Sequence, residues 1–161
     1  VGGHGEALAI GLQDVSLLEF SQEVWAFVGM GMQLQELYVS PMLMGPQHWD
    51  ILAEALAWGR AHGSILRDSH WVIGSFRNFE PYGVASWISP TGFLMLRNPW
   101  PVAQFTTPFT LADVLELPTI LTNVMLEVRV VRTLSSAAPR SDCVMGSLEG
   151  GRCVVRSSQS L

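Results

Sequence analysis

The change in hydrophobic periodicity near residue 80 constrains the fold of this 161-residue chain more than any other feature. Before it, apolar residues recur at helical spacing over 17–28 and 46–62. After it, VASWIS and FLMLRN flank Ser89-Pro90-Thr91-Gly92. Pro at the second turn position and Gly at the fourth predict a type I turn, and therefore a β-hairpin. The sequence predicts a helical region followed by antiparallel strands, joined at about 75–80.

The two predicted helices have recognisable ends. Ser16 and Glu19 have the spacing of a capping box, in which hydroxyl and carboxylate satisfy exposed amides at the helix start. Pro46 suits the first position of the second helix. His62 and Gly63 together form an ordinary helix stop signal.

A strand is predicted on each side of the second helix. QLQELYVS (33–40) precedes the helix, and 64–72, which contains ILRDSHWV, follows it. A strand, a helix and a strand within this distance predict a crossover unit with two parallel strands. The expected fold is mixed α/β: a βαβ fragment packed against a small antiparallel sheet.

Composition adds a second boundary, because acidic residues dominate before Val128 and Arg dominates after it. The end of the chain is rich in Ser and is predicted to be weakly ordered. We therefore predict four parts: a flexible N-terminus at 1–12, a barrel-type α/β region at 13–75, an antiparallel β region at 80–132 and a weakly ordered tail at 133–161.

Three stretches carry a resemblance to a known family: LQELYVSP, PQHWDILAEALAWGRAHGSILRDSHWVIG and YGVASWISPTGFLMLRNP. Together, over residues 33–118, they resemble bacterial-type proteins of the α-galactosidase-like clan of glycoside hydrolases. The resemblance implies a late βα unit of a (β/α)8 barrel, followed by the start of an antiparallel C-terminal β-sandwich. GMGM and SFRNFEP depart from the pattern of the family.

The resemblance also bears on activity. In the clan, both catalytic carboxylates are Asp residues from earlier barrel strands, which would precede Val1. It therefore implies a partial glycoside hydrolase-like protein that lacks its catalytic pair and is inactive as an isolated chain. Two alternatives stay open: a non-catalytic module that binds carbohydrate or protein, and a truncated product without independent activity.

Four residues are candidate contacts for a saccharide. Barrel sites lie at the carboxyl ends of strands, where Asp68, His70 and Trp71 are expected. Asp68 and His70 would point to one side of the strand and Trp71 to the other, where its ring could pack on a pyranose. The alternative is a turn-capping Asp68 and a structural hydrogen bond from His70. Glu36 is expected in the middle of a strand. Its carboxylate is expected either to contact the substrate or to pair with another residue in a structural role.

The amino-acid composition limits the classes of molecule that the chain is expected to bind. Net charge is −5 and Lys is absent, which argues against binding to nucleic acid. No apolar run is long enough to predict a membrane helix. Charged residues are only 14%, so part of the surface is expected to be covered, by the remainder of a barrel or by a partner subunit.

No cofactor, metal site or cellular compartment is predicted. The four His show no metal-ligand spacing, and two Cys do not complete a zinc site. Cys143 and Cys153 flank SLEGG, so a hairpin would bring them together. They form either a disulfide, which needs an oxidising compartment, or two free thiols.

Overall fold

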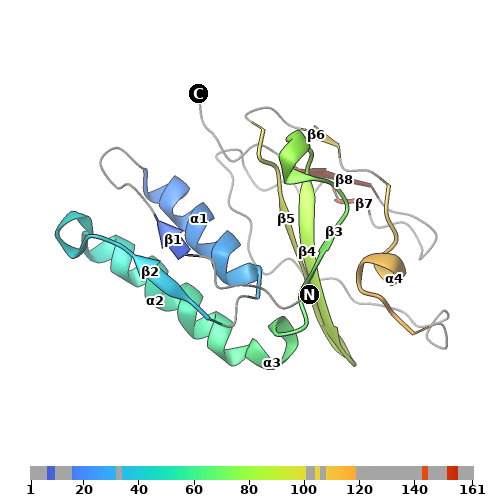
Figure 1. Cartoon of the computed structure of the whole chain (residues 1–161), viewed down its shortest axis with the longest axis horizontal. Helices are drawn as coiled ribbons and strands as arrows, with labels where there is room; N and C mark the ends of the chain where they lie inside the picture. The colour runs from blue at the N-terminus through green and yellow to red at the C-terminus, as the bar shows by residue number, and fades with distance from the viewer. Residues whose placement is uncertain are drawn as a thin grey trace.

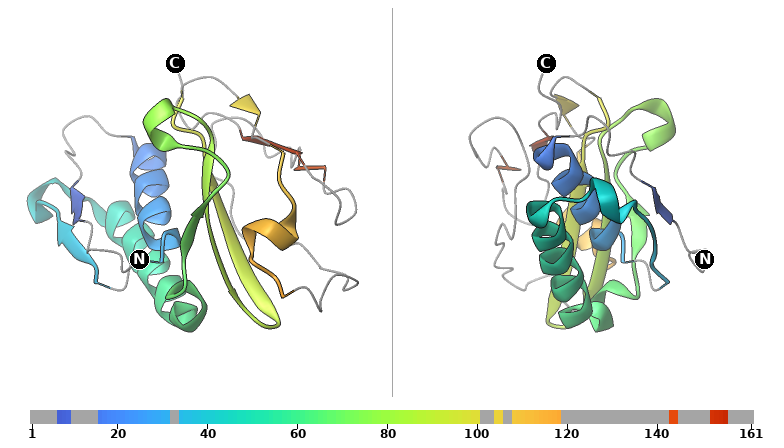
Figure 2. Two further views of the ribbon diagram at one scale, coloured as in Figure 1. Left: turned by 45° about the vertical axis from the view of Figure 1, so that its right-hand side comes forward. Right: turned by 90° about the vertical axis from the view of Figure 1, so that its left-hand side faces the viewer.

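The computed structural model describes residues 7–9, 16–31, 34–100, 104–105, 108–118, 143–144 and 152–155. A central antiparallel sheet of β3 (His70–Val72), β4 (Tyr82–Ile88) and β5 (Thr91–Arg97) organises these residues. Helices α1 (Leu17–Gly29), α2 (Pro46–Ala61) and α3 (Gly63–Leu66) lie on one side of it, and α4 (Leu111–Val114) lies on the other (Figures 1 and 2). The fold is mixed α/β with a small antiparallel sheet, as predicted at this coarser level.

Both long helices begin where the sequence predicts. The Ser16 amide donates to Oε2 of Glu19 at 2.9 Å, and the Glu19 amide donates to Oγ of Ser16 at 3.2 Å, so the capping box is confirmed. Pro46 occupies the first turn of α2, where its missing N–H costs nothing. At the end of α2, Nδ1 of His62 lies 2.8 Å from the carbonyl oxygen of Trp58.

The helical layer has its own apolar core. A Cβ atom added to Gly59 would lie 2.6 Å from Cγ1 of Val28, so the absence of a side chain allows α1 and α2 to pack closely. Burial of the apolar side chains between α1 and α2 removes apolar area from water and is the main stabilising contribution to the packing of the two helices. The buried members are Phe20, Val24, Phe27, Val28, Met44, Leu52 and Ala55.

The predicted hairpin is confirmed as β4 and β5, which pair from Tyr82↔Arg97 to Ile88↔Thr91. The connection consists of Ser89 and Pro90 alone, so Pro90 takes the third turn position and not the second as predicted. Side chains on the two strands alternate between the α1–α2 layer and the α4 layer.

The two faces of the hairpin meet different neighbours. On one face, a Cβ added to Gly29 of α1 would lie 3.3 Å from Cγ of Met95. On the other, Ala85 is fully buried in a second core with Val114 and Leu115. The central sheet therefore supplies residues to the second core and contacts the helical layer, whose own core lies between α1 and α2.

The predicted crossover unit is wrong in its pairing. The strand expected after α2 begins as helix α3, and only His70–Val72 is extended. This strand pairs antiparallel with β4, in the register Trp71↔Val84. Only residues 73–81 separate β3 from the hairpin. Pairing of β3 with the hairpin therefore closes a shorter loop than pairing of β3 with the strand before α2 would.

A parallel unit does occur one helix earlier. β1 (Ala7–Ala9) pairs with β2 (Glu36–Tyr38) in parallel, in the register Leu8↔Leu37, with α1 between them. β2 is shorter than the predicted 33–40 strand. The helices α1 and α2 separate this two-stranded sheet from the central sheet (Figures 1 and 2).

A third small sheet has the order β6 (Gln104–Phe105), β8 (Arg152–Val155), β7 (Cys143–Val144). Its β7 and β8 are antiparallel, and Cys143 lies opposite Cys153, the register that a hairpin would give. Apart from β1, β7 and β8, the predicted N-terminus and tail lie outside the described residues, as does the boundary near 128. No helix in the described ranges has the length and apolarity needed to cross a bilayer.

Candidate functional site: an aromatic patch beside the central sheet

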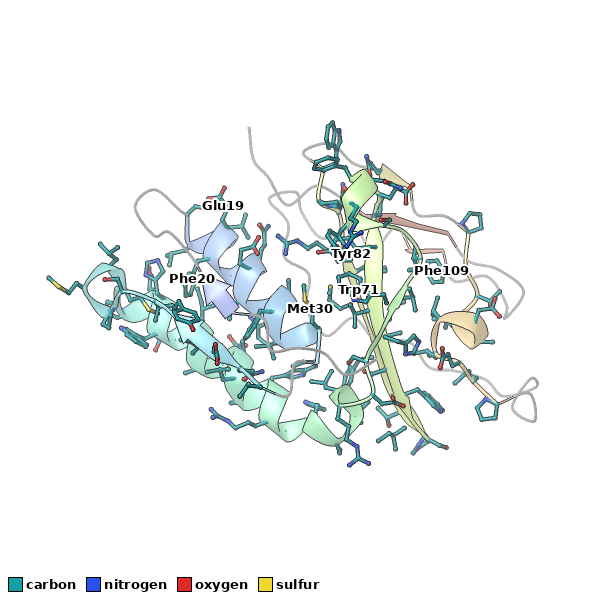
Figure 3. The ribbon with its side chains drawn as sticks, in the orientation of Figure 1. Glu19, Phe20, Met30, Trp71, Tyr82 and Phe109 are labelled. Carbon is teal, nitrogen blue, oxygen red and sulfur yellow. The ribbon has the colours of Figure 1, made fainter. Side chains whose placement is uncertain are left out.

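Trp71 is the most prominent candidate because its ring is exposed yet fixed by other rings. It pairs with Val84 and is therefore a diagonal neighbour of Tyr82 on the same face of the sheet. Its ring centroid lies 5.1 Å from that of Tyr82 and 5.4 Å from that of Phe76. Trp71 keeps 52% of its surface exposed, while the neighbouring Tyr82 is buried. Both side chains lie beside the central sheet (Figure 3). We name Trp71, Phe76 and Tyr82 the aromatic patch.

The loop 73–81 carries Phe76 and is closed by its own hydrogen bonds. The Ser75 amide donates to Oε2 of Glu80 at 2.9 Å, and the Glu80 amide donates to the Ser75 carbonyl at 3.2 Å. A Cβ on Gly74 would lie 2.3 Å from the Pro81 carbonyl oxygen, so only glycine lets the two ends of the loop approach this closely. Phe76 is thus held on a compact loop.

Two residues of this loop have backbone conformations that are rare for their type. Ile73 has φ of 79° and Phe79 has φ of 56°. A β-branched residue at positive φ is a genuine outlier, and such strain of about 1–3 kcal/mol occurs mostly where function requires a fixed shape. The two outliers lie on either side of Phe76, in the loop that carries this ring.

A polar network supports the patch from α1. Arg97 donates through both terminal nitrogens to the Glu23 carboxylate, with Nη1 3.1 Å from Oε2. Burial alone would lower the pKa of Arg97, but the hydrogen bonds and charge of Glu23, together with Tyr82, outweigh burial and raise that pKa. The guanidinium therefore stays charged next to Tyr82, and the pair joins α1 to the sheet.

More aromatic and basic surface comes from the same loop. The Phe79 and Trp100 rings meet edge to face with centroids 5.2 Å apart, and both are exposed. The Arg77 guanidinium carbon lies 5.9 Å from the Phe76 ring centroid, within cation–π range. The loop thus presents rings and an exposed hydrogen-bond donor together.

Trp71 and His70 lie on opposite sides of the sheet, as strand alternation requires. Nε2 of His70 lies 2.9 Å from the Val114 carbonyl oxygen and 3.8 Å from Oε1 of Glu116. His70 thus connects β3 to the segment around α4, which is the structural alternative considered for it. Asp68 lies in an exposed turn after α3, outside the strand, so the prediction that strand alternation aligns it with His70 is wrong.

Glu36 lies apart from the other three candidates. It is exposed on β2, and its Oε2 accepts a hydrogen bond of 3.0 Å from the Tyr38 hydroxyl. Glu36 is therefore not buried as a mid-strand residue of a barrel would be, since all three residues of β2 are exposed.

Phe76, Tyr82 and Arg97 were not among the predicted site residues. Phe76 comes from the loop 73–81, Tyr82 from the start of β4 and Arg97 from the end of β5, so no regular spacing in the sequence marks them as a cluster. Among the described residues, no three or more His, Cys, Asp or Glu side chains gather as a metal site would require. Comparison with family models, curated proteins and solved structures finds no match to this chain.

Proposed function

We propose that this chain is a carbohydrate-binding protein of glycoside hydrolase descent that holds a saccharide at the aromatic patch without cleaving it. The observation that carries the proposal is the Trp71 side chain, which is 52% exposed while its ring packs against Phe76 and Tyr82. An immobilised aromatic face stacks on the apolar face of a pyranose and loses little conformational entropy on binding.

Polar groups near the rings support a sugar as the ligand in preference to a wholly apolar one. Arg77 is exposed beside Phe76 and offers several N–H donors to hydroxyl groups. Ligand sites typically combine apolar surface with a few polar groups that fix orientation. The sequence resemblance around DSHW and YGVASWISP favours the same class of ligand.

Four glutamate carboxylates are occupied by hydrogen bonds within the chain, which supports saccharide binding without hydrolysis. Glu19 caps α1, Glu23 accepts from Arg97, Glu36 accepts from Tyr38 and Glu80 closes the loop 73–81. Each of these four carboxylates has a structural contact within the chain. In this proposal β1, α1, β2 and α2 descend from the end of a (β/α)8 barrel, and the hairpin β4–β5 descends from the start of the β-sandwich.

Affinity electrophoresis of the full chain tests the proposal, in gels that contain a galactomannan or a β-glucan. We expect one of these polymers to retard the chain and Trp71→Ala to bind on the order of tenfold more weakly. Trp49→Ala is the matched control, because Trp49 on α2 is 43% exposed and lies outside the patch. It should migrate as the unchanged chain does.

Reducing-end release from the same polymers is the second measurement. We expect no release by the isolated chain. Retardation by neither polymer, or equal loss of retardation in Trp71→Ala and Trp49→Ala, would contradict saccharide binding at the patch. Hydrolysis would contradict the statement that the chain binds without cleaving.

A further inference from the structure

Strand β2 is unusual because it is exposed along its whole length. Glu36, Leu37 and Tyr38 are all exposed, although parallel sheets are normally covered on both faces. Among the described strands, β2 pairs only with β1, so one of its edges has no described neighbour. Unpaired N–H and C=O groups on such an edge are a template for another strand.

Apolar side chains continue this exposed surface on both sides of β2. Leu34 precedes the strand, and Met42 and Leu43 follow it in the η1 turn (Pro41–Leu43). Met42 is 96% exposed, and together with Leu34 and Leu43 it adds apolar surface of the kind that marks protein interaction sites. The surface is separated from the aromatic patch by α1 and α2 (Figure 1).

The order of residues in β2 suits a second copy of itself. Tyr38 donates its hydroxyl proton to Glu36, so these two side chains share one face of the strand and Leu37 lies on the other. In an antiparallel pair centred on Leu37, Leu37 faces its own copy, and Glu36 faces Tyr38 of the second chain. The hydrogen bond made within one strand can then form twice between two strands.

We propose that two copies of this chain associate through antiparallel pairing of β2 with β2, about a two-fold axis at Leu37. The self-complementary order of residues favours a second copy of this chain over an unrelated strand as the partner. The donor Tyr38 meets the acceptor Glu36 of the second copy, and the apolar Leu37 meets its own copy. Centring the pair on Glu36 would place two carboxylates opposite each other, which is unfavourable. The pairing adds strand hydrogen bonds to the burial of Leu34, Met42 and Leu43.

Sedimentation equilibrium of the full chain over a range of concentrations tests the association. We expect a monomer–dimer equilibrium that Leu37→Asp weakens on the order of tenfold or more, because two like charges then face each other across the axis. Ile88→Asp is the matched control, since Ile88 is a strand residue that is 38% exposed, against 37% for Leu37. This variant should dimerise like the unchanged chain.

Cysteine crosslinking tests the axis without relying on a destabilising charge. In a Cys143→Ser, Cys153→Ser background, Leu37→Cys should give a covalent dimer on oxidation, because a residue on the axis meets its own copy within disulfide range. Ile88→Cys in that background should not. A chain that stays monomeric at all concentrations, or a dimer that Leu37→Asp leaves unchanged and Leu37→Cys does not crosslink, would overturn the proposal.

The two proposals fail separately. Trp71→Ala should leave the dimer intact, and Leu37→Asp should leave retardation by the polysaccharide intact. A dimer that is lost in Trp71→Ala would contradict the assignment of the interface to β2.

Discussion

At the scale of single residues, the start of α1 depends on the reciprocal contact of Ser16 and Glu19. The Glu19 carboxylate accepts hydrogen bonds from the backbone amide and from the hydroxyl of Ser16, both at 2.9 Å. These bonds favour the ionised form, and they lower the pKa of Glu19 below its ordinary value. The first turn of α1 leads directly to the buried Phe20 (Figure 3). Its order therefore affects the helical core.

This contact makes a pH-dependent contribution to stability. Because the pKa of Glu19 is lower in the folded chain, its contribution is present above the ordinary pKa of a Glu and is lost as pH falls through the folded value. Glu19→Gln should therefore lower the urea midpoint at neutral pH but have little effect at an acid pH below the folded pKa of Glu19. Ser16→Ala should cost about 1 kcal/mol at neutral pH, and the double variant should be non-additive. An equal effect of Glu19→Gln at both pH values would contradict the assignment.

The sequence revealed local residue contacts better than distant ones. The capping box was predictable because its partners lie three positions apart and form the contact within one turn. The pairing of Arg97 with Glu23 spans 74 positions, and no spacing in a single sequence encodes it. Trp71 was predicted as a candidate from its strand position, but the rings that fix it come from a loop and from the next strand.

At the scale of elements, Gly31 shapes the end of α1. It has φ of 74°, and its amide donates to the Val28 carbonyl oxygen at 3.1 Å, as at a left-handed helix end. A Cβ added there would lie 2.2 Å from the Leu66 carbonyl oxygen and 2.1 Å from Oγ of Ser69. The end of α1 thus contacts the turn that leads from α3 into β3.

Gly31→Ala should destabilise the chain by about 2–4 kcal/mol, from the unfavourable φ and from the displacement of the Leu66 backbone. Gly63→Ala is the matched control, since a Cβ there meets no atom within 4 Å and the residue is helical. The control should be neutral or slightly stabilising, because alanine favours helix. Chemical denaturation of both variants checks this, and equal midpoints would show that the contact at Gly31 is unimportant.

Element types were more predictable from the sequence than element partners. Helical spacing gave α1 and α2 nearly to the residue, and alternation gave β4 and β5. Strand propensity in 64–72 did not reveal that Gly63–Leu66 would form another helical turn or that β3 would join the hairpin. Strand pairing depends on which strand edges are unpaired and close to each other in the folded chain. A pattern of apolar residues along the sequence gives no information on either point.

At the scale of the whole molecule, two apolar cores lie on opposite sides of one sheet. Val24 belongs to the core between the helices, and Val114 belongs to the core on the α4 side. The helical layer touches the sheet where the Trp58 and Phe93 centroids lie 5.1 Å apart, and again at Gly29 and Met95. Residues of β4 alternate between the two sides, so loss of the sheet would open the core on the α4 side and remove the contacts that the helical layer makes with Phe93 and Met95.

The described residues should therefore unfold as one cooperative unit. Val24→Ala and Val114→Ala should each cost about 2 kcal/mol, since each removes buried methyl groups. Because the two sites are separated by the sheet, their effects should add in the double variant, and far-UV circular dichroism and tryptophan fluorescence should report one shared midpoint. If the cores were independent, Val24→Ala would shift the helical signal and leave a second transition unchanged. A second transition of this kind would show that the sheet does not transmit stability from one core to the other.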